Sequence, residues 1–162
     1  MSRSATAILS TDNLLHNLQV IKDKVKPAKV IAMVKANAYG HGIRSVGLRL
    51  DGRADMLGVA SIDEALALRK AGIKTDILLA EGVFEQNELL IAATEKLHVV
   101  FHNQTQIEWL DKSTLPLPIY TWIKIRTGMG RLGFGPKEAP KAYEHLLNHM
   151  QTHKPVRVMS HF

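Results

Sequence analysis

Short apolar runs alternate with amphipathic stretches from one end of this 162-residue chain to the other. Val30–Val34 is continuously apolar, which is typical of a strand buried on both faces. Further strands are predicted at Met56–Ala60, Ile77–Ala80, Leu97–Phe101, Ile119–Ile125 and Pro155–Ser160. The stretches between them carry helical spacing, as in Leu14, Leu18, Ile21 and Val25. This alternation predicts an α/β fold in which helices cover a parallel sheet.

Two architectures share this pattern: an open doubly wound sheet and a (β/α)₈ barrel. A barrel needs eight strands and about 250 residues. The sequence predicts six repeating strands, and the chain stops on the sixth. Ala5–Leu9 is predicted to form an additional short strand before the first helix. The pattern alone slightly favours the open sheet.

Composition excludes several classes of protein. The chain is 46% hydrophobic and 22% charged, which is ordinary for a globular protein and excludes disorder. It contains no cysteine, so disulfides, thiolate zinc sites and cysteine nucleophiles are excluded. No apolar run approaches the roughly 20 residues of a membrane span, and we expect a cytoplasmic protein. The net charge of +6 is spread along the chain, so nucleic-acid binding is a weak rival hypothesis.

The segment after the Val30–Val34 strand is the first candidate site. Lys35 comes directly at the strand's end, where parallel α/β folds place catalytic groups. An amine there is a candidate nucleophile or base. Gly40 and Gly42 permit the tight turns of a ligand loop, and Tyr39 supplies a hydroxyl. The alternative is a lysine that reaches into solvent beside an ordinary turn.

The second candidate is the glycine-rich segment after Ile119–Ile125. Gly128-x-Gly130-x-x-Gly133 matches the dinucleotide fingerprint in letters only, because Gly135-Pro136 precedes any helix and the required acid is missing. Lys124 and Arg131 at this strand end suit an anionic group instead. The alternative is a solvated basic loop.

Three further local patterns involve a helix start and four histidines. Ser61 and Glu64 are predicted to form a capping box for the next helix. His145, His149 and His153 recur at a spacing that can chelate zinc on a helix, but a solvated helix edge is the better interpretation, so no metal site is predicted. His161 follows the last strand and is either a site residue or a core histidine.

Three motifs resemble those of one family. Lys35-Ala36-Asn37-Ala38-Tyr39-Gly40-His41-Gly42 closely resembles the cofactor-lysine motif of the alanine racemase family. Arg131-Leu132-Gly133 is similar to that family's second signature, and Ser160-His161-Phe162 to its third. The motifs follow the family order, and the resemblance covers essentially the whole chain.

The resemblance implies an isomerase that depends on pyridoxal 5'-phosphate (PLP) and acts as a homodimer. Lys35 would hold PLP as a Schiff base and serve as one of two bases that interconvert L- and D-alanine, supplying D-alanine for peptidoglycan. Tyr39 would reach the cofactor phosphate. Arg131 would bind near the phenolic oxygen and the substrate carboxylate, and His161 would support the pyridine side. Lys124 matches a family lysine that is often carbamylated, although Arg126 stands where the family usually has an acid.

The resemblance also implies that residues 1–162 are the N-terminal part of a TIM-type barrel, with about six of its eight strands. A C-terminal β-domain is absent, and residues 1–10 would carry a strand that belongs with it. The family's second base, a tyrosine, would lie beyond Phe162, so we expect little activity from this chain alone. The alternative function is a non-catalytic PLP-binding or carrier protein of the same barrel type. Preference for alanine over serine is left open.

Overall fold

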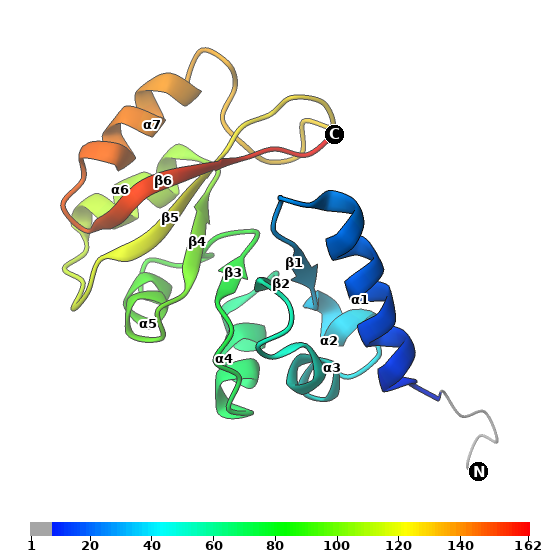
Figure 1. Cartoon of the computed structure of the whole chain (residues 1–162). Coiled ribbons are helices and arrows are strands. Elements are labelled where there is room, and N and C mark those ends of the chain that lie inside the picture. Colours follow the sequence, from blue (N-terminus) through cyan, green and yellow to red (C-terminus); the bar gives the residue numbers. More distant parts are fainter. Residues whose placement is uncertain (1–7) are drawn as a thin grey trace, which may run out of the picture.

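The computed structural model describes residues 8–162, and its six strands form one parallel sheet. The strands lie in chain order from β1 to β6, and helices flank them (Figure 1). The strands are β1 (Ile31–Met33), β2 (Met56–Val59), β3 (Ile77–Leu79), β4 (His98–Phe101), β5 (Ile119–Lys124) and β6 (Thr152–Met159). All six predicted repeating strands are confirmed.

Seven helices lie before or between these strands within the described residues. They are α1 (Thr11–Val25), α2 (Lys35–Tyr39), α3 (Ile43–Leu50), α4 (Ile62–Lys70), α5 (Glu88–Thr94), α6 (Gln104–Lys112) and α7 (Ala139–Asn148). None of the helices within residues 8–162 is long and apolar enough to cross a membrane. The predicted strand at Ala5–Leu9 falls largely on residues 1–7, outside the described residues, and Ile8 and Leu9 are not in a strand.

Strand order and packing decide between the two architectures. A doubly wound sheet reverses its strand order at a switch point, whereas this sheet runs from β1 to β6 without reversal. The main core joins one face of the strands, including Leu57, Leu79 and Phe101, to helix residues such as Leu68 and Leu110. A smaller cluster on the other face contains strand residues and Ala80, which directly follows β3, and no helix residue. Helices on one face and sequential order identify a partial barrel, so the slight preference for an open sheet was wrong.

Side-chain caps mark the starts of two helices. Ser10 caps α1 by accepting a hydrogen bond from the Asn13 amide at 3.2 Å. Asn103 caps α6, since its side chain accepts from the Gln106 amide at 2.9 Å. The apolar spacing of α5 extends back to Phe84, but the helix begins only at Glu88. Caps therefore fix the helix starts more exactly than hydrophobic spacing predicts.

Candidate functional site

Polar residues from three strands meet at the carboxyl end of the sheet. Lys35 follows β1, Glu81 follows β3 and His102 follows β4. The Lys35 ammonium donates to a Glu81 carboxylate oxygen at 3.2 Å, and both side chains are about one-third exposed. His102 Nε2 donates to the Glu81 backbone carbonyl at 3.0 Å. Parallel strands thus place Lys35 at a shared edge, as predicted, and pair it with a carboxylate that the sequence analysis did not single out.

The segment after Lys35 has an unusual backbone conformation. Ala36, Asn37, Ala38 and Tyr39 all have φ between +50° and +56°, and Gly40 follows at +85°. Each non-glycine residue in this left-handed region costs roughly 1–2 kcal/mol. Such strain persists where surrounding contacts impose it, and it clusters at active and ligand-binding sites. The lysine therefore begins a short left-handed turn rather than an ordinary loop.

Hydrogen bonds close this left-handed turn on itself. The Ala38 amide donates to the Val34 carbonyl at 2.8 Å, and the Gly42 amide donates to the Asn37 carbonyl at 2.9 Å. The Asn37 side chain accepts from the Ile43 amide at 2.8 Å and so joins the turn to α3. Tyr39, at the end of the turn, is 59% exposed, so its ring is open to solvent rather than packed in the core.

The turn is also attached to α4, and this attachment replaces the predicted capping box. The Ser61 side chain makes no capping hydrogen bond. Glu64 instead accepts from the Ala60 amide at 2.9 Å with one oxygen and from the Ala36 amide at 2.6 Å with the other. The capping-box prediction was wrong because the carboxylate bonds outside its own helix.

Lys124 is the buried cation of the site. It ends β5 and is only 8% exposed. Burial lowers its pKa first, and the positive charges of Arg131 and Lys35 lower it further, while the Glu81 carboxylate opposes them. A lowered pKa increases the fraction of neutral amine, which is the nucleophilic form. Lys124, Arg131 and His161 line the same small pocket, so the structure brings these three predicted residues together.

Arg126 pairs with the carboxylate of Glu138, the residue directly before α7. Its guanidinium lies 3.9 Å from a Glu138 carboxylate oxygen, and both side chains are exposed. The lowered pKa of Lys124 is set by burial, Arg131 and Lys35. The residue that departs from the family pattern is therefore not a dominant influence on Lys124.

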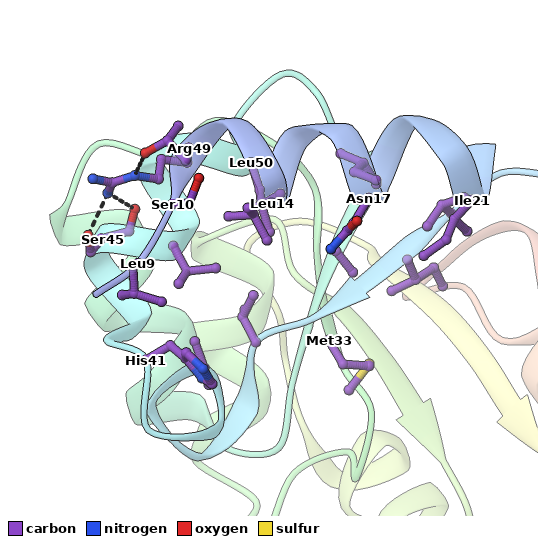
Figure 2. Close-up of a pocket in the computed structure, with 18 residues that line it drawn as sticks. Leu9, Ser10, Leu14, Asn17, Ile21, Met33, His41, Ser45, Arg49 and Leu50 are labelled. Atoms are coloured by element: carbon purple, nitrogen blue, oxygen red, sulfur yellow. Dashed lines mark hydrogen bonds between the residues drawn. The ribbon is translucent and has the colours of Figure 1, made fainter. Parts of the chain in front are cut away.

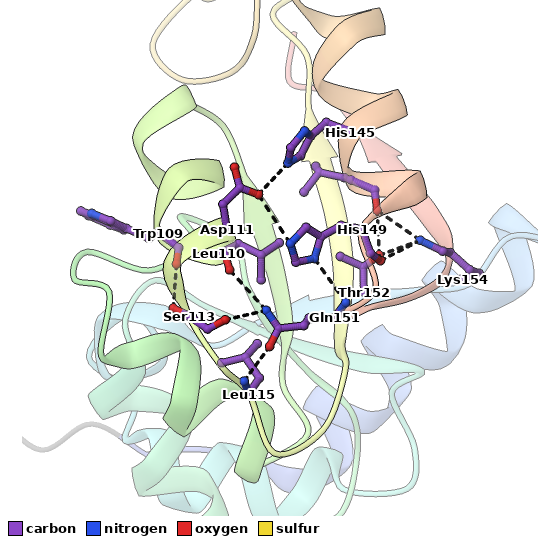
Figure 3. Close-up of polar contacts among 11 residues, drawn as sticks. Trp109, Leu110, Asp111, Ser113, Leu115, His145, His149, Gln151, Thr152 and Lys154 are labelled. Carbon is purple, nitrogen blue, oxygen red and sulfur yellow. Dashed lines mark hydrogen bonds and ion pairs between the residues drawn. The ribbon is translucent and has the colours of Figure 1, made fainter.

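His145 and His149 belong to a network of polar contacts with Asp111 (Figure 3). Asp111 on α6 accepts from His145 at 2.7 Å and lies 3.5 Å from His149, while burial lowers the pKa of His149. The helix ends at Asn148, so His153 lies instead on β6 and stacks on Tyr120. The expectation of one helical edge was wrong. Across residues 8–162, no group of three or more histidine and carboxylate side chains could hold a metal ion.

A separate apolar cavity of about 420 Å³ lies between α1 and β1 (Figure 2). Aliphatic side chains such as Leu14, Ile21 and Met33 line it. Lys35, Arg131 and His161 are not among its lining residues. This apolar cavity is thus distinct from the polar site.

Comparison with known proteins identifies the family. The sequence profile described as "Alanine racemase, N-terminal domain" matches residues 9–162. The chain belongs to the alanine racemase family. An alanine racemase from Legionella pneumophila (strain Lens) is 45% identical over 161 residues, which is 99% of this chain and 45% of that protein. One from Haemophilus influenzae is 44% identical over 99% of this chain and 44% of its own length.

A solved structure agrees with the sequence matches. The biosynthetic alanine racemase from Pseudomonas aeruginosa superposes with a TM-score of 0.85 at 33% identity, covering 93% of this chain and 42% of that one. The chain therefore spans just under half the length of the alanine racemases that it matches. The partial barrel and the membership of the family, both implied by the three motifs, are confirmed.

Proposed function

We propose that this chain is the lysine-bearing part of an alanine racemase that interconverts L- and D-alanine with PLP. The observation that carries the proposal is the placement of Lys35 on a left-handed turn at the carboxyl end of β1, paired with Glu81 at 3.2 Å. Catalytic groups of barrel enzymes lie at this end of the strands. Membership of the family supplies the reaction class.

The residues at this site fit PLP in their chemistry. Lys35 offers a partly exposed amine for the aldehyde of PLP, and Arg131 offers a guanidinium for an anionic oxygen. Tyr39 would contact the phosphate with its exposed hydroxyl, and His161 would support the ring from the end of β6. The cofactor, when bound, supplies an electron sink for the carbanion at the substrate Cα.

The chain's own groups then handle the substrate and its proton. Arg131 would orient the carboxylate of alanine by charge-assisted hydrogen bonds. The Lys35 amine, once free, would remove or return the Cα proton on its face of the substrate, acting as a general base or acid. Glu81 would hold the ammonium form at a fixed position between transfers. These roles need one further base on the opposite face.

Lys124 is proposed as a carbamate site. The lowered pKa increases the fraction of neutral amine. That amine would form an N–C bond to carbon dioxide and lose one proton to solvent, and the product is an anionic carbamate. The cations beside it, Arg131 and Lys35, would stabilise that negative charge. A carbamate there would in turn orient the Arg131 guanidinium.

Properties of the whole protein are proposals of the same kind. The relatives are about twice as long as this chain, so we expect the second base and the rest of the phosphate site to come from sequence that those relatives have in addition. On that basis residues 1–162 alone would show little or no racemase activity. A homodimer in the cytoplasm that supplies D-alanine for peptidoglycan is the role implied by the resemblance.

The test uses borohydride to fix bound PLP onto the intact protein that contains this chain, followed by peptide mapping. We expect the label on the peptide that contains Lys35, and no label after Lys35→Ala. The unsubstituted, PLP-loaded protein should also abolish the optical rotation of an L-alanine solution. A label on another lysine refutes the site assignment, and PLP binding without any loss of rotation would favour the non-catalytic carrier.

A further inference from the structure

Glu64 makes two backbone hydrogen bonds that join two separate parts of the barrel. One carboxylate oxygen accepts from the Ala60 amide at 2.9 Å, within the connection from β2 to α4. The other accepts from the Ala36 amide at 2.6 Å, immediately after Lys35 and 28 residues away in sequence. Ala36 is also the first left-handed residue of the turn. Glu64 therefore contacts the backbone where strain begins.

Two other helices of the chain show what the local bond alone does. In α5, Glu88 accepts from the Phe84 amide, four residues earlier, at 2.7 Å. In α6, Gln106 accepts from the His102 amide, again four residues earlier, at 2.9 Å. The bond from Glu64 to Ala60 has this same spacing, so it closes a strand–helix connection. The bond to Ala36 has no counterpart of that kind and needs a separate explanation.

Gln106 also shows why a carboxylate is required at position 64. Its oxygen makes the local bond, and its amide nitrogen donates to the Val83 carbonyl at 3.0 Å. At position 64 the second partner is the Ala36 amide, which is a donor rather than an acceptor. A glutamine there would direct its NH₂ group at another N–H, whereas both oxygens of a carboxylate accept.

We propose that Glu64 is a positioning residue for the cofactor lysine, and this rests on the proposed function. It acts through the backbone: it holds the Ala36 amide, selects the left-handed turn and so fixes the direction of the Lys35 side chain beyond the end of β1. Glu81 holds the ammonium itself at 3.2 Å, so the two carboxylates constrain Lys35 at opposite ends of the residue. Glu64 touches neither substrate nor the reacting amine.

The test compares Glu64→Gln with Glu88→Gln in the intact protein. Both substitutions retain length and the local four-residue bond, as Gln106 demonstrates, but only Glu64→Gln removes an acceptor from the Lys35 turn. The first readout is amide hydrogen exchange of the peptide covering residues 34–40, which needs no cofactor. The second is PLP affinity and the visible absorbance of the bound cofactor as pH is varied.

We expect Glu64→Gln to speed exchange in residues 34–40 by about tenfold or more and to weaken PLP binding by a similar factor, with a shifted pH profile of absorbance. Glu88→Gln should change neither. Equal behaviour of the two variants overturns the proposal, and so does faster exchange without any change in PLP binding or absorbance. If the unsubstituted protein takes up no PLP at all, the proposed function fails and the role of Glu64 fails with it.

Discussion

Replacing Gly82 by alanine should destabilise the protein more than the same replacement at a glycine that has a similar positive φ but empty space around it. Gly82 directly follows Glu81 and has φ of +72°. A Cβ added there would lie 2.3 Å from the Val100 carbonyl oxygen and 2.5 Å from the Gln106 side-chain nitrogen. Neither distance is tolerable for a carbon atom, and the carbonyl belongs to a buried strand. The loop that carries Glu81 must therefore move.

Gly72 supplies the matched control. Its φ is +88°, and an added Cβ would meet nothing within 4 Å. Left-handed alanine costs roughly 1–2 kcal/mol, partly offset by about 0.4–1 kcal/mol from the lower entropy of the unfolded chain. We therefore expect Gly72→Ala to lower the free energy of unfolding by about 1 kcal/mol. Gly82→Ala adds overpacking of about 1–3 kcal/mol, for a total of about 3 kcal/mol.

Urea titrations followed by far-ultraviolet circular dichroism measure both free energies of unfolding. Because displacement of Glu81 also breaks its 3.2 Å contact with Lys35, Gly82→Ala should weaken PLP binding while Gly72→Ala leaves it unchanged. Free energies for the two variants within about 0.5 kcal/mol of each other would refute the steric reasoning.

Two further predictions concern charge. Burial lowers the pKa of His98 from 6.5 to about 4, and Trp122 donates to its Nδ1 at 3.1 Å, so the folded protein holds the ring neutral. Between pH 6.5 and pH 4 the His98 ring is protonated in the unfolded chain but not in the folded protein. The contribution of His98 to the free energy of unfolding is therefore fully present above pH 6.5 and falls by about 3 kcal/mol towards pH 4. Urea midpoints of His98→Asn should accordingly depend less on pH than those of the unsubstituted protein. Arg126→Ala should lower the free energy of unfolding by less than about 1 kcal/mol, because the ion pair of Arg126 with Glu138 is exposed. The carbon dioxide adduct proposed on Lys124 should persist in this variant, as measured with ¹³C-labelled bicarbonate. A lost adduct would show that Arg126 acts on Lys124.

The central strands β2, β3 and β4 could be predicted from sequence because they are apolar apart from His98 and fully buried. In contrast, β1 is only partly buried, against the expectation of a strand buried on both faces, and β6 carries polar residues such as Lys154 and Arg157. Leu57, Val59, Leu79 and Val99 have essentially no exposed surface, which is the condition that a continuous apolar run reports. The choice between barrel and open sheet could not be made in this way, since both place the same residues in the same strands. Strand order is a property of long-range pairing, such as Ile31 with Met56, and no local pattern encodes it.

About half of the site residues could be predicted from their positions at the ends of strands. Lys35 and Lys124 could be predicted because each comes at the end of an apolar run, and Glu81 carries the same signal directly after Ile77–Ala80. The same reasoning applied to every strand end places Glu81 at the same edge of the sheet as Lys35. The specific roles of Tyr39, Arg131 and His161 rest instead on the motif resemblance, and these roles stay predictions.

The left-handed turn lay beyond sequence reasoning for a physical reason. Alanine disfavours positive φ, so the local preference of Ala36 and Ala38 opposes the conformation that they adopt. Contacts distant in sequence supply the compensation, and the bond from Glu64 to the Ala36 amide is one of them. The interpretation of Glu64 as a helix cap used only its nearest neighbours. A carboxylate with two oxygens can accept a hydrogen bond beside its own helix with one and a hydrogen bond from a remote strand end with the other, and this second bond joins α4 to the backbone directly after Lys35.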